Sequence, residues 1–428
     1  MKKLKVILIG AGGRGRRYTN VMKELPEQFE LVGIAEPVEN LREGVRQLHG
    51  VDPKDCYESW EEILDRPKFA DIAVIATMDQ MHYAPAMKAI ELGYDLLLEK
   101  PVAPTPEECT AIWRQAEKYG TKIMVCHVLR YTPFFMRLKE IIQEGTLGDI
   151  ITMEHIEAVG NIHQTTSFVR GRWGNEGRST PMLLQKCCHD LDILQWLLDK
   201  ECTKIQSFGS LVHFRAENAP EGAPERCMDG CPHADTCYYH AYPIYVEKRY
   251  KIGSPRQATM MLNPTKEDIL HTMATTQFGK CVYKCDNDVV DHQIVNMEFE
   301  GGATVSMTMS AFTEGGRKTH IMGTKGELWA EMSNKETPFI FYDFATREKR
   351  ALSADIAIAG DSITTGHGGG DAGIVDALYR YVTGELTAEE VSEIGVSCKN
   401  HMLAFAAEES RHNDTVVSVP KYAAKYFE

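Results

Sequence analysis

Short apolar runs alternate with stretches of helical periodicity over the first 127 residues. Such an alternation is typical of βαβ units around a parallel sheet. The predicted strands are Val6–Ile9, Leu31–Ala35, Asp71–Ala76, Tyr94–Leu98 and Lys122–Cys126. We therefore expect residues 1–127 to form an α/β domain with a parallel sheet.

Local signals place helices between these strands. Capping boxes at Ser59–Glu62 and Thr105–Glu108 mark two helix starts, because each pairs a hydroxyl with a carboxylate three residues later. Gly93 and Gly120 fall at predicted helix ends, where glycine readily adopts the left-handed conformation that closes a helix.

After about Cys126 the pattern changes to longer, alternating, Thr-rich segments. Ile150–Glu157 and Ala303–Ser310 indicate strands with one polar face, so an antiparallel or mixed sheet is expected. A chain of 428 residues exceeds what one core usually serves, and residues 128–428 are predicted to form a second domain for substrate binding and oligomerisation. Residues 218–254, rich in Pro, Cys, Tyr and His, indicate a loop-rich insertion within it.

Composition narrows the range of partners. The net charge of −14 and the pI of about 5.6, with no run of Lys and Arg, argue against a nucleic-acid partner. The apolar run in Met1–Gly10 is too short for a signal peptide, and no stretch approaches the roughly 20 apolar residues of a membrane helix. We therefore expect a cytoplasmic protein with reduced thiols and no membrane partner.

A glycine-rich motif follows the first predicted strand and precedes a helical stretch. The motif is Gly10-Ala11-Gly12-Gly13-Arg14-Gly15. Glycines let the backbone turn tightly and approach a pyrophosphate, whose charge then lies at the helix N-terminus. The carboxylate of Glu36, at the end of the second predicted strand, accepts hydrogen bonds from an unmodified ribose and repels a 2′-phosphate. A Rossmann domain that binds NAD rather than NADP is predicted; the alternative is a glycine-rich turn of another doubly wound protein.

Two further elements carry a family resemblance. Asp71–Thr77 is followed by His82 and then by Leu96-Leu97-Leu98-Glu99-Lys100-Pro101. With these the chain resembles the Gfo/Idh/MocA family, the relatives of glucose-fructose oxidoreductase and inositol dehydrogenase, over nearly its whole length. The resemblance implies a Rossmann domain, then an α/β domain with a large open sheet, and hydride transfer between a sugar or polyol hydroxyl and NAD(P). It also implies a homodimer or homotetramer built on that sheet, with Thr77, His82, Glu99 and Lys100 beside the cofactor.

Lys100 is the first predicted catalytic residue. It stands at the carboxyl end of a strand, where open α/β sheets bind ligands, and Pro101 biases it to an extended conformation. A lysine there hydrogen-bonds a reacting hydroxyl and stabilises a developing alkoxide. The alternative is a solvated surface lysine.

The second part of the site is expected on Gln185-Lys186-Cys187-Cys188-His189-Asp190-Leu191-Asp192, which resembles the family's helix with an acid and a histidine four residues later. Spacing of four places Gln185 and His189 on one helical face. His189 is the predicted catalytic histidine, because an ordinary pKa of about 6.5 suits proton exchange. Gln185 replaces the family's usual acid and cannot act as a base, so Lys186 is predicted as an added cation. The alternative is a structural histidine bonded by Asp192.

The substrate side is predicted on Asn161–Gln164 and Ser167–Trp173, which combine donors, acceptors and aromatic surface as a sugar site requires. The expected contacts are Tyr131, His163, Arg170, Trp173, Gln185 and His292. A small-molecule carbohydrate is the predicted substrate. The alternative is a loop whose Arg and Trp only pack between domains.

A rival function comes from Gly366–Asp371, which resembles a Gly-His-Gly-Gly stretch of the NAD-dependent α-N-acetylgalactosaminidases. Such an enzyme oxidises the sugar at C3, eliminates the aglycone, adds water and re-reduces the ring. It needs a second base near C2, for which His163, Tyr131 and His292 are candidates. A third class, a sensor without turnover, is disfavoured by Lys100 and His189.

Soft ligands cluster in the predicted insertion. Cys227, Cys231, His233 and Cys237 are close enough in sequence to converge on one zinc ion. Further ligands would come from Cys202, Cys281 or Cys285. The two alternatives for these cysteines are a structural zinc site and free thiols.

Overall fold

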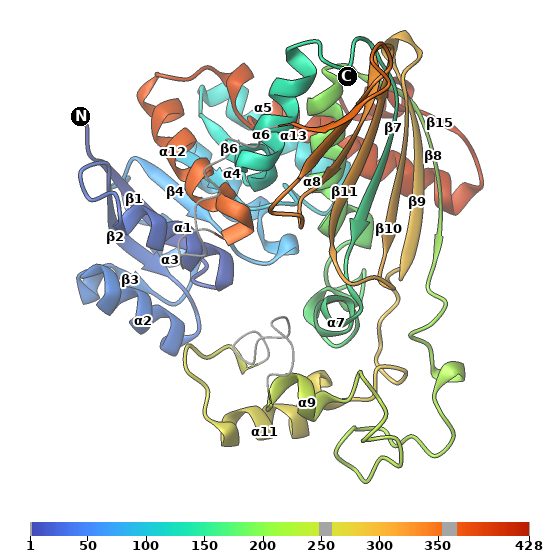
Figure 1. The fold of residues 1–428 in the computed structure, drawn as a ribbon. Helices are drawn as coiled ribbons and strands as arrows, with labels where there is room; N and C mark the ends of the chain where they lie inside the picture. Colours follow the sequence, from blue (N-terminus) through green and yellow to red (C-terminus); the bar gives the residue numbers. More distant parts are fainter. Residues whose placement is uncertain (1, 248–258, 353–365, 428) are drawn as a thin grey trace.

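The computed structural model describes residues 2–247, 259–352 and 366–427. Figure 1 shows a smaller sheet with its helices beside a larger twisted sheet, and a third, loop-rich part below them. None of the described helices is long and apolar enough to cross a membrane.

The first sheet confirms the predicted Rossmann-type domain. Its strands are β1 (Leu4–Ile9), β2 (Phe29–Ala35), β3 (Cys56–Tyr57), β4 (Ile72–Ile75), β5 (Asp95–Leu98) and β6 (Ile123–Val125). They pair in parallel in the order β3-β2-β1-β4-β5-β6. The helices are α1 (Gly13–Lys23), α2 (Glu39–His49), α3 (Trp60–Leu64), α4 (Tyr83–Glu91) and α5 (Pro106–Tyr119). The hydroxyls of Ser59 and Thr105 cap α3 and α5 as the sequence indicates.

The second sheet is open and mostly antiparallel, as expected. Its strands are β7 (Ile150–Ala158), β8 (Cys202–Ser210), β9 (His292–Phe299), β10 (Thr304–Ser310), β11 (Gly316–Gly323), β12 (Gly326–Glu331), β13 (Phe339–Asp343), β14 (Lys349–Ala351) and β15 (Val417–Ser418). Their order is β14-β13-β12-β11-β7-β10-β9-β8-β15, in which β7 and β10 run parallel. The remaining helices are α6 (Pro133–Gln143), α7 (Asn161–His163), α8 (Met182–Leu198), α9 (Ala241–Tyr245), α11 (Lys266–Thr275), α12 (Gly370–Thr383), α13 (Ile394–Asn413) and α14 (Val419–Phe427).

The connection between β8 and β9, residues 211–291, forms the loop-rich part and is called the insertion below. Phe214, Tyr239 and Tyr245 of the insertion are buried in a small apolar cluster, to which Ile162, Val169 and Ala311 contribute from outside it. Of the predicted insertion, residues 248–254 lie outside the described residues. The insertion is therefore a packed unit rather than a single loop.

Two C-terminal helices return to the first domain. Residues of α12 share an apolar core with β1 and β2, and the hydroxyl of Tyr379 donates to the carbonyl of Lys2 (3.0 Å). Val125 of β6 donates its N–H to the carbonyl of Ser392 (2.8 Å), just before α13. The first domain is thus completed by chain from far beyond residue 127, an arrangement that local sequence patterns do not reveal.

A buried ion pair joins the segment after β6 to α8. The guanidinium of Arg130 donates to both carboxylate oxygens of Asp192, each at 2.7 Å, and the amide of Asn400 donates at 2.6 Å. Burial alone would raise the pKa of Asp192, but the charge of Arg130 and the hydrogen bonds from Arg130 and Asn400 together hold that pKa below its ordinary value. The carboxylate is therefore ionised and fully paired inside the protein.

Removal of this carboxylate should destabilise the fold. We expect Asp192→Ala to lower the free energy of unfolding by about 3–5 kcal/mol, because it leaves the charge of Arg130 buried without a partner. Glu298→Ala, which breaks an exposed pair with Lys204, should cost no more than about 1 kcal/mol. Urea unfolding followed by circular dichroism measures both, and equal losses would contradict the role of the buried pair.

Candidate active site

The glycine turn after β1 leaves room for a ligand. Gly10 has a φ of +93°, and a Cβ there would lie 2.6 Å from the carbonyl oxygen of Ala76. A Cβ on Gly15 would lie 2.1 Å from the carbonyl oxygen of Gly10. At Gly12 and Gly13, where α1 begins, an added Cβ meets nothing within 4 Å. Two glycines thus permit the turn, and two keep the helix N-terminus open to a pyrophosphate.

Glu36 lies at the carboxyl end of β2 beside this turn. Its carboxylate oxygens accept the N–H of Ala11 (2.7 Å) and of Val38 (3.0 Å). Each oxygen keeps a further lone pair for a ribose hydroxyl. The glycine cradle and this acid together fit a nicotinamide dinucleotide.

Arg14 is placed differently from the prediction. Its guanidinium donates to Glu99 (2.9 Å), to the hydroxyl of Tyr18 (2.5 Å) and to Asp371 of α12 (2.6 Å). Because these contacts occupy the guanidinium, the side chain links β5 and the C-terminal helix to the glycine turn. Only its backbone belongs to the predicted pyrophosphate cradle.

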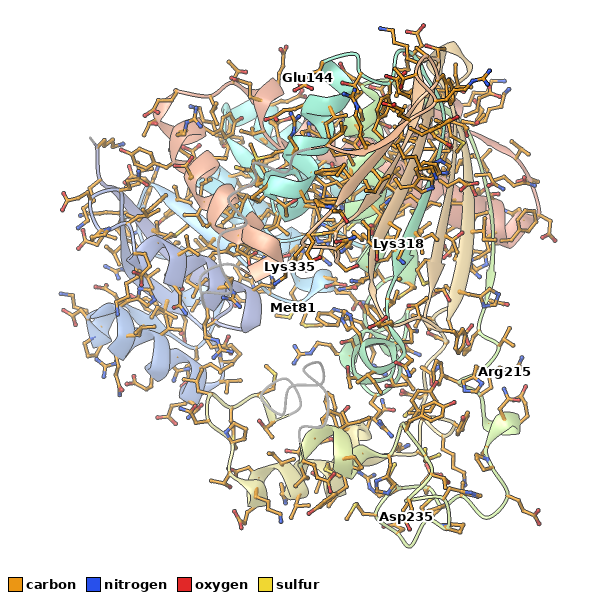
Figure 2. The ribbon with its side chains drawn as sticks, in the orientation of Figure 1. Met81, Glu144, Arg215, Asp235, Lys318 and Lys335 are labelled. Atoms are coloured by element: carbon orange, nitrogen blue, oxygen red, sulfur yellow. The ribbon has the colours of Figure 1, made fainter. Side chains whose placement is uncertain are left out.

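The loop after β5 is held from several sides. Glu99 accepts the hydroxyl of Tyr18 (2.6 Å) on one oxygen and the N–H of Lys100 (2.9 Å) on the other. The ring of His82 is fully buried, with nitrogens 2.7 Å from the carbonyl oxygen of Pro101 and 3.3 Å from that of Thr77. His82 therefore positions this loop, and its ring is not exposed for a ligand. Met81, labelled in Figure 2, marks the neighbouring loop on the side facing the second sheet.

The ammonium group of Lys100 reaches the second domain. It donates to the backbone carbonyl of Gln185 on α8 at 2.6 Å. Because Gln185 lies one helical turn before His189, this bond holds the lysine against the part of α8 that carries the histidine. The structure thus brings Lys100, Gln185 and His189 together across the two domains.

Asp192 is occupied elsewhere, by Arg130 and Asn400. The ring of His189 lies edge-on to that of His127, with centroids 5.8 Å apart. His127 is fully buried, which lowers its pKa to about 4, and keeps its ring neutral. The predicted catalytic histidine therefore packs against a neutral aromatic ring.

A charged cluster that the sequence did not indicate surrounds Lys186. Its ammonium lies 3.1 Å from the carboxylate of Glu157 on β7, which also pairs with Arg317 of β11 (2.7 Å). Arg317 in turn donates to Asp190 (2.7 Å). Glu157 and Arg317 are direct neighbours in the β7–β11 register, and only the sheet pairing brings them together.

His163 lies within the field of these cations. Burial and then the charges of Lys186, Arg317 and Lys100 lower its pKa to about 3. Its ring is 5.8 Å from Phe168, which is 6.0 Å from Trp173. The indole N–H of Trp173 is buried without an acceptor among the described residues, so it is available to a ligand. The three rings lie next to one another as the predicted aromatic wall requires, but Phe168 is fully buried, so only His163 and Trp173 have exposed ring surface.

Three predicted substrate contacts have other partners or face another side. Tyr131 is hydrogen-bonded to Ser392, and burial raises its pKa to about 12. Arg170 is buried and donates to backbone carbonyls of Lys280 and Tyr239, anchoring the insertion. His292 lies on the open face of the second sheet, because the next residue on β9, Gln293, points to Glu408 of α13 on the covered face.

The predicted zinc ligands are not assembled. The sulfur of Cys227 accepts from Arg170 at 3.4 Å, and a ring nitrogen of His233 lies 2.8 Å from the carbonyl oxygen of Glu221. Among the described residues there is no group of three or more His, Cys, Asp or Glu side chains suited to a metal ion. Sequence proximity of Cys227, Cys231, His233 and Cys237 was therefore an insufficient guide, since a buried guanidinium occupies their surroundings.

Comparison with known proteins matches both parts of the chain to one family. Residues 4–127 match the oxidoreductase family with an NAD-binding Rossmann fold, and residues 139–341 match the C-terminal alpha/beta domain of that family. YteT of Bacillus subtilis, an oxidoreductase by name, is 23% identical over 406 residues, which is 87% of this chain and 88% of YteT.

Two further relatives have more specific names. The inositol 2-dehydrogenase/D-chiro-inositol 3-dehydrogenase of Lactiplantibacillus plantarum is 21% identical over 225 residues, 52% of this chain and 61% of that enzyme. A levoglucosan dehydrogenase solved with NADH and L-sorbose has a TM-score of 0.70 at 18% identity, over 98% of this chain and 100% of that one.

The structural likeness extends over both domains, and the two family matches together span most of the sequence. The resemblance seen in the Glu-Lys-Pro element is thereby confirmed: this chain belongs to the Gfo/Idh/MocA family of oxidoreductases.

Proposed function

We propose that this protein is a dehydrogenase that transfers hydride between a hydroxyl-bearing carbon of a sugar or glycoside and NAD. The observation that carries the proposal is the bond from the ammonium of Lys100 to the carbonyl of Gln185, one turn from His189. This bond supports a site in which Lys100 of the first domain and His189 of the second act on the same hydroxyl. The names of the inositol and levoglucosan dehydrogenases support a cyclic polyol or sugar as substrate.

The proposed chemistry divides the two hydrogens of a secondary alcohol. NAD, when bound, accepts the hydride from carbon. Lys100 donates a hydrogen bond to the reacting oxygen and stabilises its developing negative charge. His189 takes the hydroxyl proton in the oxidation direction and returns it in reduction. Gln185 has no basic group, so His189 carries the proton in this arrangement.

The chain also supplies the electrostatic setting. Lys100, Lys186 and Arg317 are the cations that act on His163, while Glu157 and Asp190 pair with Lys186 and Arg317. Surplus positive charge beside a reacting oxygen favours the alkoxide over the alcohol. Trp173, which packs beside the buried Phe168 and is itself only partly buried, supplies apolar surface for a ring face.

The redox-neutral glycosidase is the alternative, and it requires a second base near C2. His163 has a pKa of about 3, so it is a weak base. Tyr131 has a pKa of about 12 and a bonded hydroxyl, and His292 faces the other side of the sheet. None of the three candidates has the properties of this base, which favours the dehydrogenase.

A substrate panel tests the proposal. Purified protein is incubated with free sugars, cyclic polyols and nitrophenyl glycosides, with and without added NAD, while NADH absorbance and nitrophenol are followed. We expect NADH to accumulate with at least one sugar, polyol or intact glycoside, without nitrophenol release. Nitrophenol release with no net NADH would establish the glycosidase instead.

Lys100→Ala and His189→Ala should each lower the rate of hydride transfer by about 10²–10⁴-fold, the usual contribution of an acid–base group. NADH affinity should stay nearly unchanged, because the glycine turn and Glu36 are untouched. Single-turnover absorbance measures the first effect and fluorescence titration the second. Loss of NADH binding in both variants would make these residues cofactor anchors, and near-normal transfer in His189→Ala would assign the proton to Lys186.

Glu36 is proposed to select NAD over NADP. NADH should bind at least about tenfold more tightly than NADPH, since roughly 1.4 kcal/mol of charge repulsion suffices for that ratio. Glu36→Ala should lower the ratio of the NADPH to the NADH dissociation constant. Glu39→Ala, which removes an exposed acid on the following helix, should leave this ratio unchanged. Fluorescence titration with both reduced cofactors measures it, and tighter NADPH binding by the native protein would refute the assignment.

A second copy of this chain is proposed to cover the open face of the large sheet. Ile156 of β7, Ile294 of β9 and Phe208 of β8 are exposed and lie in one row of the sheet register, with Thr308 of β10 between the two isoleucines. When such a row lies on a two-fold axis, it packs against the same row of the second copy, and both rows are removed from water.

Sedimentation at micromolar concentration should therefore show a dimer or larger assembly. Phe208→Asp should shift it to the monomer, whereas Leu48→Asp, an exposed position on α2, should not. A monomeric native protein would contradict the proposal. A Phe208→Asp variant that remains assembled would show that this face is not the subunit interface.

A further inference from the structure

The insertion reaches the first domain next to the predicted cofactor groove. The N–H of Leu262 donates to the side-chain oxygen of Asn40 at 3.1 Å. Asn40 lies in the first turn of α2, four residues after Glu36. Figure 1 shows this part of the chain running from α11 up to the lower end of the first domain near α2.

The contact is close-packed as well as hydrogen-bonded. A Cβ on Gly44 of α2 would lie 2.1 Å from a terminal methyl group of Leu262. Met260 and Leu262 are partly buried against the apolar core that contains Leu41. Glycine in a helix interior costs about 1 kcal/mol relative to alanine, so its presence here matches the need for close approach.

Arg172 connects the same segment to the loop after β4. It belongs to a short helix, η5 (Arg172–Gly174), of the second domain and is half-buried. Its guanidinium donates to the sulfur of Met78 at 2.9 Å and to that of Met260 at 2.7 Å. Within the described part of the chain these thioethers are its only acceptors, and a thioether is a weak acceptor.

Arg172 lies beside the strand ends where a dinucleotide cofactor is expected to bind. Met78 follows β4, and the carboxylates of Asp79 and Glu36 are near enough to act on the guanidinium charge, although burial prevails and lowers the pKa of Arg172. The carboxyl ends of β1, β2 and β4 form the edge where the cofactor pyrophosphate and adenosine bind. A planar guanidinium is well matched to phosphate oxygens and poorly matched to sulfur.

We propose that Arg172 binds a phosphate of the dinucleotide, and that the segment with Met260 and Leu262 closes over the groove, so that NAD dissociates slowly from this protein. This rests on the proposed function only in taking NAD as the cofactor. The glycine turn and Glu36 would supply two sides of the groove, and the second domain a third. Release of NAD would then require the Leu262–Gly44 contact to separate.

The test measures NADH dissociation in the absence of substrate. Protein–NADH complexes are mixed with excess NAD in a stopped-flow instrument, and loss of energy transfer from tryptophan to NADH gives the rate. Arg172→Leu should accelerate dissociation about 10–100-fold, the range expected for loss of a hydrogen bond to a charged group. The matched control is Arg178→Leu, which removes an exposed arginine that pairs with Asp286.

A second variant tests the closing segment independently of the arginine. Gly44→Leu should displace Leu262 and accelerate dissociation about tenfold, whereas Gln47→Leu, at an exposed position of the same helix, should not. Near-ultraviolet circular dichroism of the cofactor-free variants verifies that each is folded. If Gly44→Leu does not fold, Met260→Ala is used in its place to loosen the closing segment.

Ligand fragments identify the phosphate contact. Arg172→Leu should weaken the binding of ADP-ribose but leave that of adenosine unchanged, because adenosine has no phosphate. Native dissociation rates in both Arg172→Leu and Gly44→Leu would overturn the inference while leaving the dehydrogenase proposal intact. A native protein that binds no NADH would overturn the proposed function as well.

Discussion

The carboxylate of Glu99 is buried at the junction of the two domains, and the site is organised around its charge. One oxygen accepts Arg14 and the hydroxyl of Tyr18, and the other accepts the N–H of Lys100. Burial opposes ionisation, yet the charges of Arg14 and Lys100 hold the pKa of Glu99 below its ordinary value. An ionised buried carboxylate needs all of these partners. It therefore fixes Lys100, the proposed catalytic lysine, relative to the glycine turn.

This constraint extends to the C-terminal part of the chain. Arg14, which pairs with Glu99, also pairs with Asp371 at the start of α12. At the other end, Lys100 donates to Gln185 on α8. A continuous set of polar contacts thus runs from α12 through the glycine turn to the helix with His189. Relative movement of the domains would break charged hydrogen bonds within it, so the two halves of the site are held in register.

Charge is distributed unevenly between the outside and the inside of the protein. The chain has a net charge of −14, yet Lys100, Lys186 and Arg317 converge on His163. Carboxylates offset part of this positive charge, as the pairing of Glu157 with Lys186 shows. In a partly dehydrated site such charges act more strongly than in water. The arrangement keeps His163 neutral, in agreement with the proposal that His189 carries the proton.

The sequence by itself determined the features that depend on local patterns. Apolar periodicity located every strand of the first sheet except β3, because each buried parallel strand is a short apolar run between helices, whereas β3 has only two residues, both partly exposed. The glycine turn, Glu36 and the Glu-Lys-Pro element were recognisable because each residue acts within a few positions of its neighbours. The pairing of Lys100 with Gln185 and His189 followed instead from the family resemblance, and the bond from Lys100 to the carbonyl of Gln185 agrees with it.

The tertiary structure alone decided which distant residues meet. Glu157 and Arg317 are neighbours only through the β7–β11 register, and Arg172 reaches Met78 only because the two domains pack together. Arg170 and His292 have residue types suited to a sugar site, but burial and strand alternation direct them elsewhere. The four predicted zinc ligands form no metal site among the described residues for a similar reason, since Arg170 donates to Cys227 and the carbonyl of Glu221 bonds His233. Side-chain chemistry is a local property, whereas the direction and neighbours of a side chain follow from packing between segments far apart in the chain.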